Sequence, residues 1–167
     1  IRGFGDAPGA NAEGPVLDPF IAELADYIDD EIIGKGRPAP AIVGHSLGGL
    51  SALMIAARHH KLAGKIMIID ALPFIGTIFG AKDIEAVRAQ ATQMAAMIRK
   101  SPAKPPLDCN DPAVAEAVQS IWSNSAKGRC LVENWSRKSD PNVTAQAMLD
   151  DTLTDMRPET QRWGAGV

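Results

Sequence analysis

The sequence predicts an α/β fold in which a small parallel sheet with flanking helices is followed by an all-helical segment. A short apolar run, 38–43, leads through a glycine-rich turn into an apolar helical run, 50–60. A second apolar run, 65–70, completes a strand–helix–strand unit, whose strands must pair in parallel through a right-handed crossover. After residue 72 only helical periodicities appear, several of them starting at a proline.

These patterns divide the chain into an α/β core at 1–72, a helical segment at 73–158 and a divergent tail at 159–167. The chain has 167 residues, 46% of them hydrophobic, which suffices for one core with a small appendage. A net charge of -3 and an aromatic content of 5% argue against a nucleic-acid partner. No apolar run is long enough to span a bilayer, so we expect a soluble, cytoplasmic protein.

The first helix is predicted to follow an N-terminal loop at 1–15. Asp18 and Pro19 indicate its start, as cap and first helical residue, and Gly34 its end. Its apolar residues recur at steps of three and four and form one face: Leu17, Phe20, Ile21, Leu24, Ile28 and Ile32.

Both predicted strands are apolar on both faces, which is typical of buried parallel strands. Gly44 follows the first strand and Asp70 ends the second, so both lie at the same edge of the sheet. Open α/β sheets bind their ligands at that edge.

The turn between strand and helix reads Gly44-His45-Ser46-Leu47-Gly48, the G-x-S-x-G pattern of a nucleophile elbow. In such an elbow the serine sits on a strained turn with its hydroxyl clear of the sheet. Side chains at Gly44 and Gly48 would meet the neighbouring helix and strand, which predicts glycine at both. We therefore predict Ser46 as a nucleophile and the Leu47 N–H, at the helix N-terminus, as an oxyanion donor. His45 should point away from Ser46.

The helical segment is predicted to contain helices at 82–99, from Pro112, at 129–137 and from Pro141 to about Leu153. The second of these should turn four apolar residues inward: Val114, Val118, Ile121 and Trp122. Two interpretations remain open for the large apolar residues of the segment, an apolar acyl pocket or simple packing between helices: Met94, Met97, Trp122, Trp135 and Met148.

Cys109 and Cys130 either form a disulfide or remain two thiols, and a disulfide would favour the periplasm. Their spacing matches no zinc pattern, and the three histidines do not complete one. The N-terminal glycines lack the spacing of a dinucleotide fingerprint. We therefore expect neither a metal nor a cofactor.

The chain resembles the α/β-hydrolase superfamily, in particular esterase- and lipase-like serine hydrolases with a helical lid. Residues 1–5 are similar to the R-G-x-G loop after the family's fourth strand, and 42–49 match the strand and the common G-H-S-[LM]-G-G elbow. Residues 66–72 match the sixth strand and the helical segment matches the lid. Asp155-Met156-Arg157-Pro158 is similar to a D-x-R-P element that closes the lid in some members.

The resemblance implies hydrolysis of a small carboxylic ester through an acyl-enzyme on Ser46. The family's third strand, and the later strands that carry the catalytic acid and histidine, match no part of this chain. Asp70 is the only carboxylate well placed to orient a base. We therefore expect weak or absent activity for this chain alone. We also expect apolar sheet surface that the rest of a parent protein, a partner or a second copy covers.

Two kinds of alternative stay open. A non-catalytic module of the same fold would bind a small apolar ligand under the lid. Within the enzymes, peptidases, acyltransferases and thioesterases share the serine elbow, whereas haloalkane dehalogenases place an aspartate there, so Ser46 argues against them.

Overall fold

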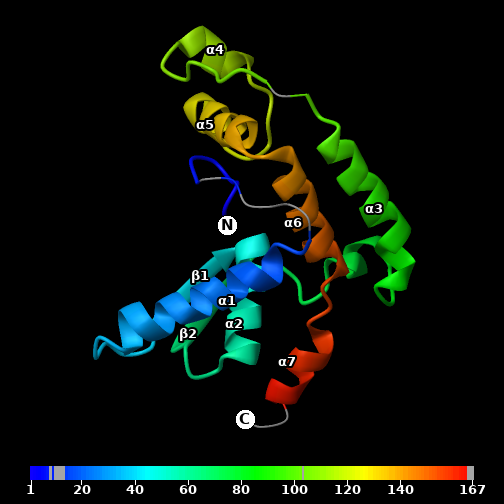
Figure 1. Cartoon of the computed structure of the whole chain (residues 1–167). Helices are drawn as coiled ribbons and strands as arrows, with labels where there is room; N and C mark the ends of the chain where they lie inside the picture. The colour runs from blue at the N-terminus through cyan, green and yellow to red at the C-terminus, as the bar shows by residue number, and fades with distance from the viewer. Residues whose placement is uncertain (8, 10–13, 103, 165–167) are drawn as a thin grey trace.

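The computed structural model describes residues 1–7, 9, 14–102 and 104–164. The sheet has two strands. Figure 1 shows the sheet at one end of the molecule with the helices of residues 17–28 and 47–58, and an arm formed by the helices of residues 112–117 and 126–138 at the other end. The helices of residues 85–99 and 141–153 lie side by side between them. None of the described helices has the length and apolarity that a bilayer span requires. In chain order the elements are α1 (Leu17–Ile28), the π-helix η1 (Asp29–Ile33), β1 (Ala41–His45), α2 (Leu47–Arg58), β2 (Lys65–Ile69), the 3-10 helix η2 (Ile75–Phe79), α3 (Glu85–Arg99), α4 (Pro112–Ala117), α5 (Ala126–Lys138), α6 (Pro141–Leu153) and α7 (Arg157–Gly164).

The strand–helix–strand unit is confirmed. β1 and β2 pair in parallel, in a register that runs from Ala41 opposite Lys65 to His45 opposite Ile69. Helix α2 makes the crossover and packs with α1 on one face of the sheet. Each fully buried aliphatic side chain in this core contributes about 1.5–3 kcal/mol. The core consists of Leu17, Ile21, Ala25, Ile28, Leu50, Leu53, Met54, Ile55 and Met156.

The prediction that both strands are buried is wrong for this chain. The side chains of Val43 and Met67, paired across the sheet, are 65% and 59% exposed. The reason is that α1 and α2 pack on one face, while no described element covers the face that carries Val43 and Met67. The expected exposure of apolar sheet surface is therefore confirmed.

Helix α1 starts differently from the local prediction. Its N-cap is Val16, which has no side-chain cap of its own. The N–H groups of Val16 and Leu17 donate instead to the Asp150 carboxylate of α6, over 2.7 and 2.9 Å. Asp18, predicted as the cap, pairs with Arg58 of α2 at 2.8 Å. The helix continues through η1 to Gly34, as predicted.

The proline-marked helix starts are confirmed. Asp111 and Asp140 precede Pro112 and Pro141 and accept hydrogen bonds from the N–H groups two residues ahead, the geometry of an N-cap. Ser125 caps α5, which begins three residues before the prediction. A disulfide, Cys109–Cys130, ties the loop before α4 to α5.

One prediction for the arm is wrong. Helix α4 ends at Ala117, so the helical spacing does not continue to Ile121 and Trp122. Their side chains are 89% and 70% exposed instead of turned inward. Val118 does pack against the disulfide.

The Asp155–Pro158 element joins the two ends of the helical segment. The Met156 N–H donates to the carbonyl oxygen of Pro73 over 2.7 Å. The Arg157 guanidinium donates to Asp155 at 2.6 Å and to the Lys82 carbonyl at 2.8 Å, and lies 4.5 Å from the centre of the Phe74 ring. The hydrogen bond from Arg157 lowers the pKa of the Asp155 carboxyl. Helix α7 follows directly, so the described part of the predicted tail is helical.

Candidate active site

Ser46 occupies a strained backbone position between β1 and α2. Its φ of 52° and ψ of -124° lie outside the regions that residues with a side chain normally adopt. Its N–H donates to the carbonyl oxygen of Ile69 at the end of β2, over 3.0 Å. The other described non-glycine residue with a positive φ is Asp70, at 50°. Both follow paired strands, so the backbone strain is concentrated at one edge of the sheet.

The glycines of the turn have different roles from those predicted. A Cβ at Gly44 would overlap the carbonyl oxygen of Gly48, so glycine is required there, as predicted. A Cβ at Gly48 would meet nothing within 4 Å, so the predicted clash at that position is wrong. The second close approach is at Gly49, where a Cβ would lie 2.7 Å from the Cβ of Ala71.

Leu47 is the first residue of α2, and its N–H has no acceptor in the described part of the chain. The N–H groups of Gly49 and Leu50 donate back to the Ser46 carbonyl at 2.8 and 3.1 Å, and the Ser51 hydroxyl donates to the Leu47 carbonyl at 2.8 Å. The first helical turn is thereby fixed, while the Leu47 N–H stays available next to Ser46.

The described residues place no histidine in hydrogen-bond contact with the exposed Ser46 hydroxyl. The Nε2 atom of His45 lies 3.9 Å from the Asp70 carboxylate, beyond hydrogen-bond distance, and both side chains are exposed. His59 is the C-cap of α2, at the opposite end of the helix from Ser46, and His60 follows it. The arrangement therefore places an exposed serine hydroxyl next to the Leu47 N–H, and no histidine among the described residues contacts that hydroxyl.

A cavity of about 240 Å³ opens beside Ser46 and Leu47. Residues of η2, α3 and α6 form the rest of its wall, which is mostly apolar. The remaining residues of the wall are Ile75, Phe79, Val87, Gln90, Ala91, Met94, Met148, Asp151 and Thr152.

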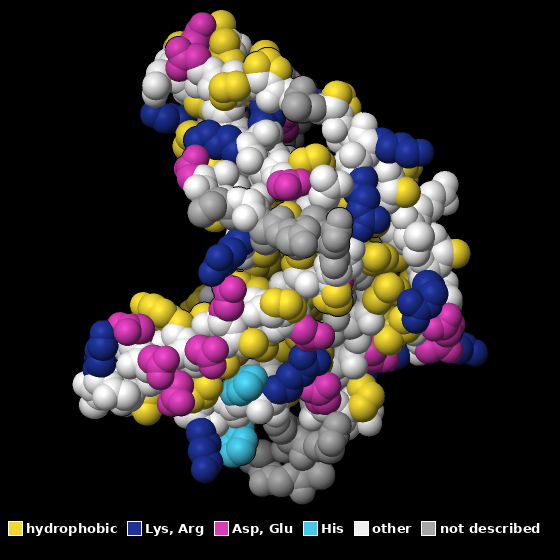
Figure 2. All heavy atoms as spheres, in the orientation of Figure 1, with side chains coloured by type: hydrophobic (Ala, Val, Ile, Leu, Met, Phe, Trp, Pro, Cys, Tyr) yellow, Lys and Arg dark blue, Asp and Glu magenta, His cyan; other side chains and the backbone are white. Residues whose placement is uncertain are grey.

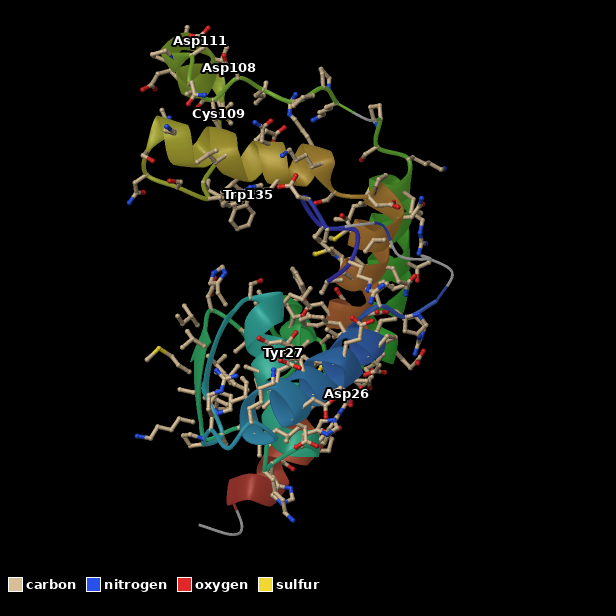
Figure 3. All side chains as sticks on the ribbon, turned by 60° about the vertical axis from the view of Figure 1, so that its left-hand side comes forward. Asp26, Tyr27, Asp108, Cys109, Asp111 and Trp135 are labelled. Atoms are coloured by element: carbon tan, nitrogen blue, oxygen red, sulfur yellow. A yellow bond between two sulfur atoms is a disulfide. The ribbon has the colours of Figure 1, made fainter. Side chains whose placement is uncertain are left out.

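Of the five large apolar residues considered for an acyl pocket, Met94 and Met148 line this cavity. Met97 and Trp122 are mainly exposed. Trp135 projects from α5 toward the α/β end of the molecule, where it borders a separate hollow with Phe4 (Figure 3). For Met97, Trp122 and Trp135 neither interpretation is borne out, because these side chains are more than half exposed and lie outside the cavity beside Ser46.

Sequence reasoning missed Asp151. Asp151 lines the cavity and is half-buried, and its carboxyl makes no hydrogen bond or ion pair within the described residues. Burial raises the pKa of this carboxyl. Asp151 lies three residues after Met148 on α6, so the helical spacing would have placed the two side chains on one face.

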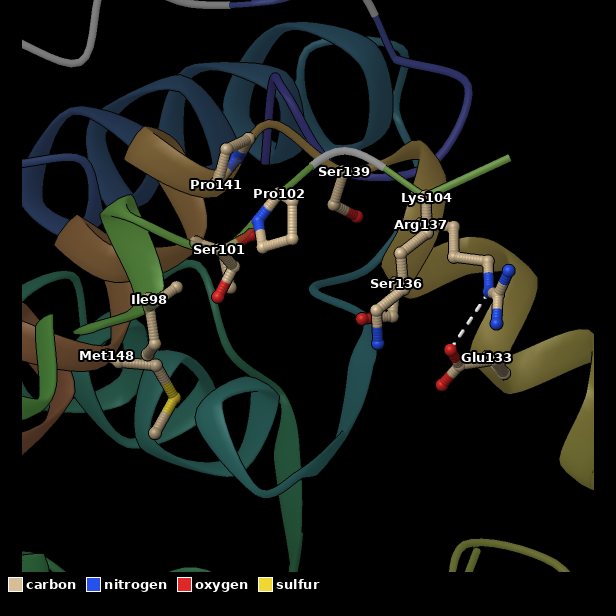
Figure 4. Close-up of a pocket in the computed structure, with 11 residues that line it drawn as sticks. Ile98, Ser101, Pro102, Lys104, Glu133, Ser136, Arg137, Ser139, Pro141 and Met148 are labelled. Carbon is tan, nitrogen blue, oxygen red and sulfur yellow. Dashed lines mark hydrogen bonds and ion pairs between the residues drawn. The ribbon is translucent and has the colours of Figure 1, made fainter. Parts of the chain in front are cut away.

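A larger cavity of about 410 Å³ lies between the end of α3 and the junction of α5 with α6 (Figure 4). Arg137, which lines this cavity, already donates hydrogen bonds to the Glu133 carboxylate over 2.9 Å and to the Pro105 carbonyl over 2.7 Å. Ser46 does not line it. In the described part of the chain, no three His, Cys, Asp or Glu side chains are grouped to hold a metal ion. The cavity beside Ser46 is therefore the candidate site.

The comparison with known families agrees with this arrangement. A model described as the alpha/beta hydrolase family matches residues 1–165, nearly the whole chain. The match includes the strand–turn–helix around Ser46 and the helices that close the cavity. The chain belongs to the alpha/beta hydrolase family.

Proposed function

We propose that this chain carries the nucleophile of a serine hydrolase that acts on small carboxylic esters. The single observation that carries the proposal is the backbone at Ser46, whose positive φ holds an exposed serine at the mouth of an apolar cavity. Such a strained residue costs about 1–3 kcal/mol and persists at sites where the strain serves function. Membership of a family of generally hydrolytic enzymes supports the same conclusion.

In the proposed reaction the Ser46 Oγ attacks the carbonyl carbon of the ester, and the Leu47 N–H donates to the oxyanion that forms. The bond to the alcohol oxygen then breaks, and the alcohol leaves with a proton. Water attacks the acyl-enzyme, releases the carboxylic acid and restores the Ser46 hydroxyl.

A base must take the proton from Ser46 and deliver it to the leaving alcohol. No described residue is bonded to the Ser46 hydroxyl, so the chain alone should retain little more than the effect of binding and of the oxyanion donor. That residual effect is about 10³–10⁴-fold over the uncatalysed reaction in serine proteases that lack a triad member. The catalytic acid and histidine would come from the parts of the fold that this chain does not match.

We further propose that residues 73–158 act as the lid over the site. Helices α3 and α6 contribute Met94 and Met148 to the cavity wall, and η2 contributes Ile75 and Phe79. An apolar part of the substrate would lie against these side chains and exclude water from the ester.

A fluorophosphonate probe tests the nucleophile directly, since it bonds covalently to an activated serine. We expect slow labelling of the chain at Ser46, and faster labelling when imidazole is added to replace the absent base. Ser46→Ala should abolish the labelling. Ser136→Ala is the matched control, because this exposed serine of α5 lies outside the cavity beside Ser46.

Mass mapping of the labelled peptide decides the outcome. Equal labelling of the wild-type chain and Ser46→Ala would contradict the proposal, as would imidazole-independent labelling spread over several serines.

The second candidate is a non-catalytic module that binds a small apolar ligand in the same cavity. The observation that favours it is the Ser46 hydroxyl without a base among the described residues. This candidate predicts ligand binding that Ser46→Ala leaves unchanged, together with no fluorophosphonate labelling even in the presence of imidazole.

A further inference from the structure

The cavity beside Ser46 contains one ionisable side chain, Asp151, among the eleven residues that line it. Its other polar side chains, Ser46, Gln90 and Thr152, are neutral. The carboxyl therefore dominates the electrostatics of a mostly apolar wall.

The neighbouring carboxyls of the same region are already paired. The Asp150 carboxylate accepts hydrogen bonds from the N–H groups of Val16 and Leu17, and the Asp155 carboxylate accepts two hydrogen bonds from the Arg157 guanidinium. The Asp151 carboxyl has neither a hydrogen-bond donor nor a cation among the described residues, although it is half-buried. A carboxyl that is removed from water without a partner is unfavourable, and burial accordingly raises its pKa.

We propose that Asp151 selects ligands that carry an ammonium or similar cationic nitrogen on an apolar chain. Such a nitrogen supplies the charge-assisted hydrogen bond that the protein does not provide, while the apolar chain contacts Met94 and Met148. A neutral ligand leaves the carboxylate unpaired, and an anionic ligand is repelled. Resting on the proposed function, this selection makes the substrate class esters with an amino group in the acyl or alcohol part.

Binding can be measured apart from catalysis, with three six-carbon probes that differ only in the head group: hexylammonium, 1-hexanol and hexanoate. We propose NMR titration of the full chain with each. The wild-type chain should bind hexylammonium about tenfold more tightly than 1-hexanol, the effect of one charge-assisted hydrogen bond. Hexanoate should bind most weakly.

Asp151→Asn keeps the size of the side chain and should remove the preference for hexylammonium, while 1-hexanol binds at least as tightly. Asp151→Ser provides a second variant if the first fails to fold. Asp26→Asn is the matched control, because Asp26 is an exposed residue of α1 that does not line the cavity, and the substitution makes the same change in net charge. It should leave the preference intact.

The inference is overturned if the wild-type chain shows no preference for hexylammonium, or if the preference survives in Asp151→Asn. Ser46→Ala separates this inference from the proposed function, since it should keep the preference. A preference that depends on Asp151 in a chain without labelling at Ser46 would refute the hydrolase alone. Labelling at Ser46 without the preference would refute the selection alone.

Discussion

At the residue scale, the turn at Ser46 depends on two close approaches of the backbone. Gly44 faces the Gly48 carbonyl and Gly49 faces Ala71. The motif predicts the first of these, since Gly44 lies within the five residues of the turn itself. The second is a contact between Gly49 in α2 and Ala71, which follows β2 and Asp70 in the chain. No local sequence pattern contains such a contact between separate segments.

The two glycines of the G-x-S-x-G motif, Gly44 and Gly48, should respond differently to substitution, because only Gly44 lies against neighbouring backbone. Gly44→Ala should lower the free energy of unfolding by about 3 kcal/mol, because its Cβ overlaps backbone that cannot move away. Gly48→Ala should leave stability unchanged or raise it by up to about 1 kcal/mol, since the position is open and helical. Urea unfolding monitored by circular dichroism measures both, and a similar loss in both variants would contradict the assignment.

At the element scale, helix boundaries follow local rules wherever no distant group competes. Asp111 and Asp140 cap α4 and α6 as their position before a proline predicts. At α1 the same rule fails, because the Asp150 carboxylate of α6 reaches the N–H groups of Val16 and Leu17 and starts the helix earlier than Asp18 would. The carboxylate that stabilises this helix start lies on a different helix.

We therefore expect Asp150→Ala to cost more than Asp18→Ala. The first leaves two partly buried N–H groups without their acceptor, which should lower the free energy of unfolding by about 1–3 kcal/mol. The second breaks an exposed ion pair with Arg58, worth at most about 1 kcal/mol. Thermal and urea unfolding give the two values, and the reverse order would show that the local cap controls α1.

At the scale of the whole molecule, the described elements cover one face of the sheet and leave the other face exposed. Figure 2 shows the surface hollowed between the α4–α5 arm and the α/β end. The disulfide between Cys109 and Cys130 holds this arm together, and we expect such a bond to persist in an oxidising compartment such as the periplasm.

The uncovered face of the sheet carries Val43 and Met67, a surface that a second copy or a partner would bury.

We expect the isolated chain to self-associate through this face, with a sedimentation coefficient that rises with concentration. Met67→Lys should shift the chain toward the monomer, because a charge on the sheet face opposes burial. Met97→Lys is the matched control, since Met97 is 60% exposed on α3 compared with 59% for Met67. Sedimentation velocity that shows a monomer at every concentration would contradict the prediction, as would an equal shift in the control.

The sequence by itself determined the strand–helix–strand unit, the parallel pairing, the proline-marked helices and the position of Ser46 at a strand-to-helix turn. These follow from periodicity and backbone preferences within short stretches of chain. Only the tertiary structure decided that Asp151 shares a cavity with Ser46, that Asp150 starts α1, that Gly49 makes the close approach and that the exposed face of the sheet is the one that carries Val43 and Met67. Each of these depends on contacts between segments distant in the sequence, which no local pattern encodes.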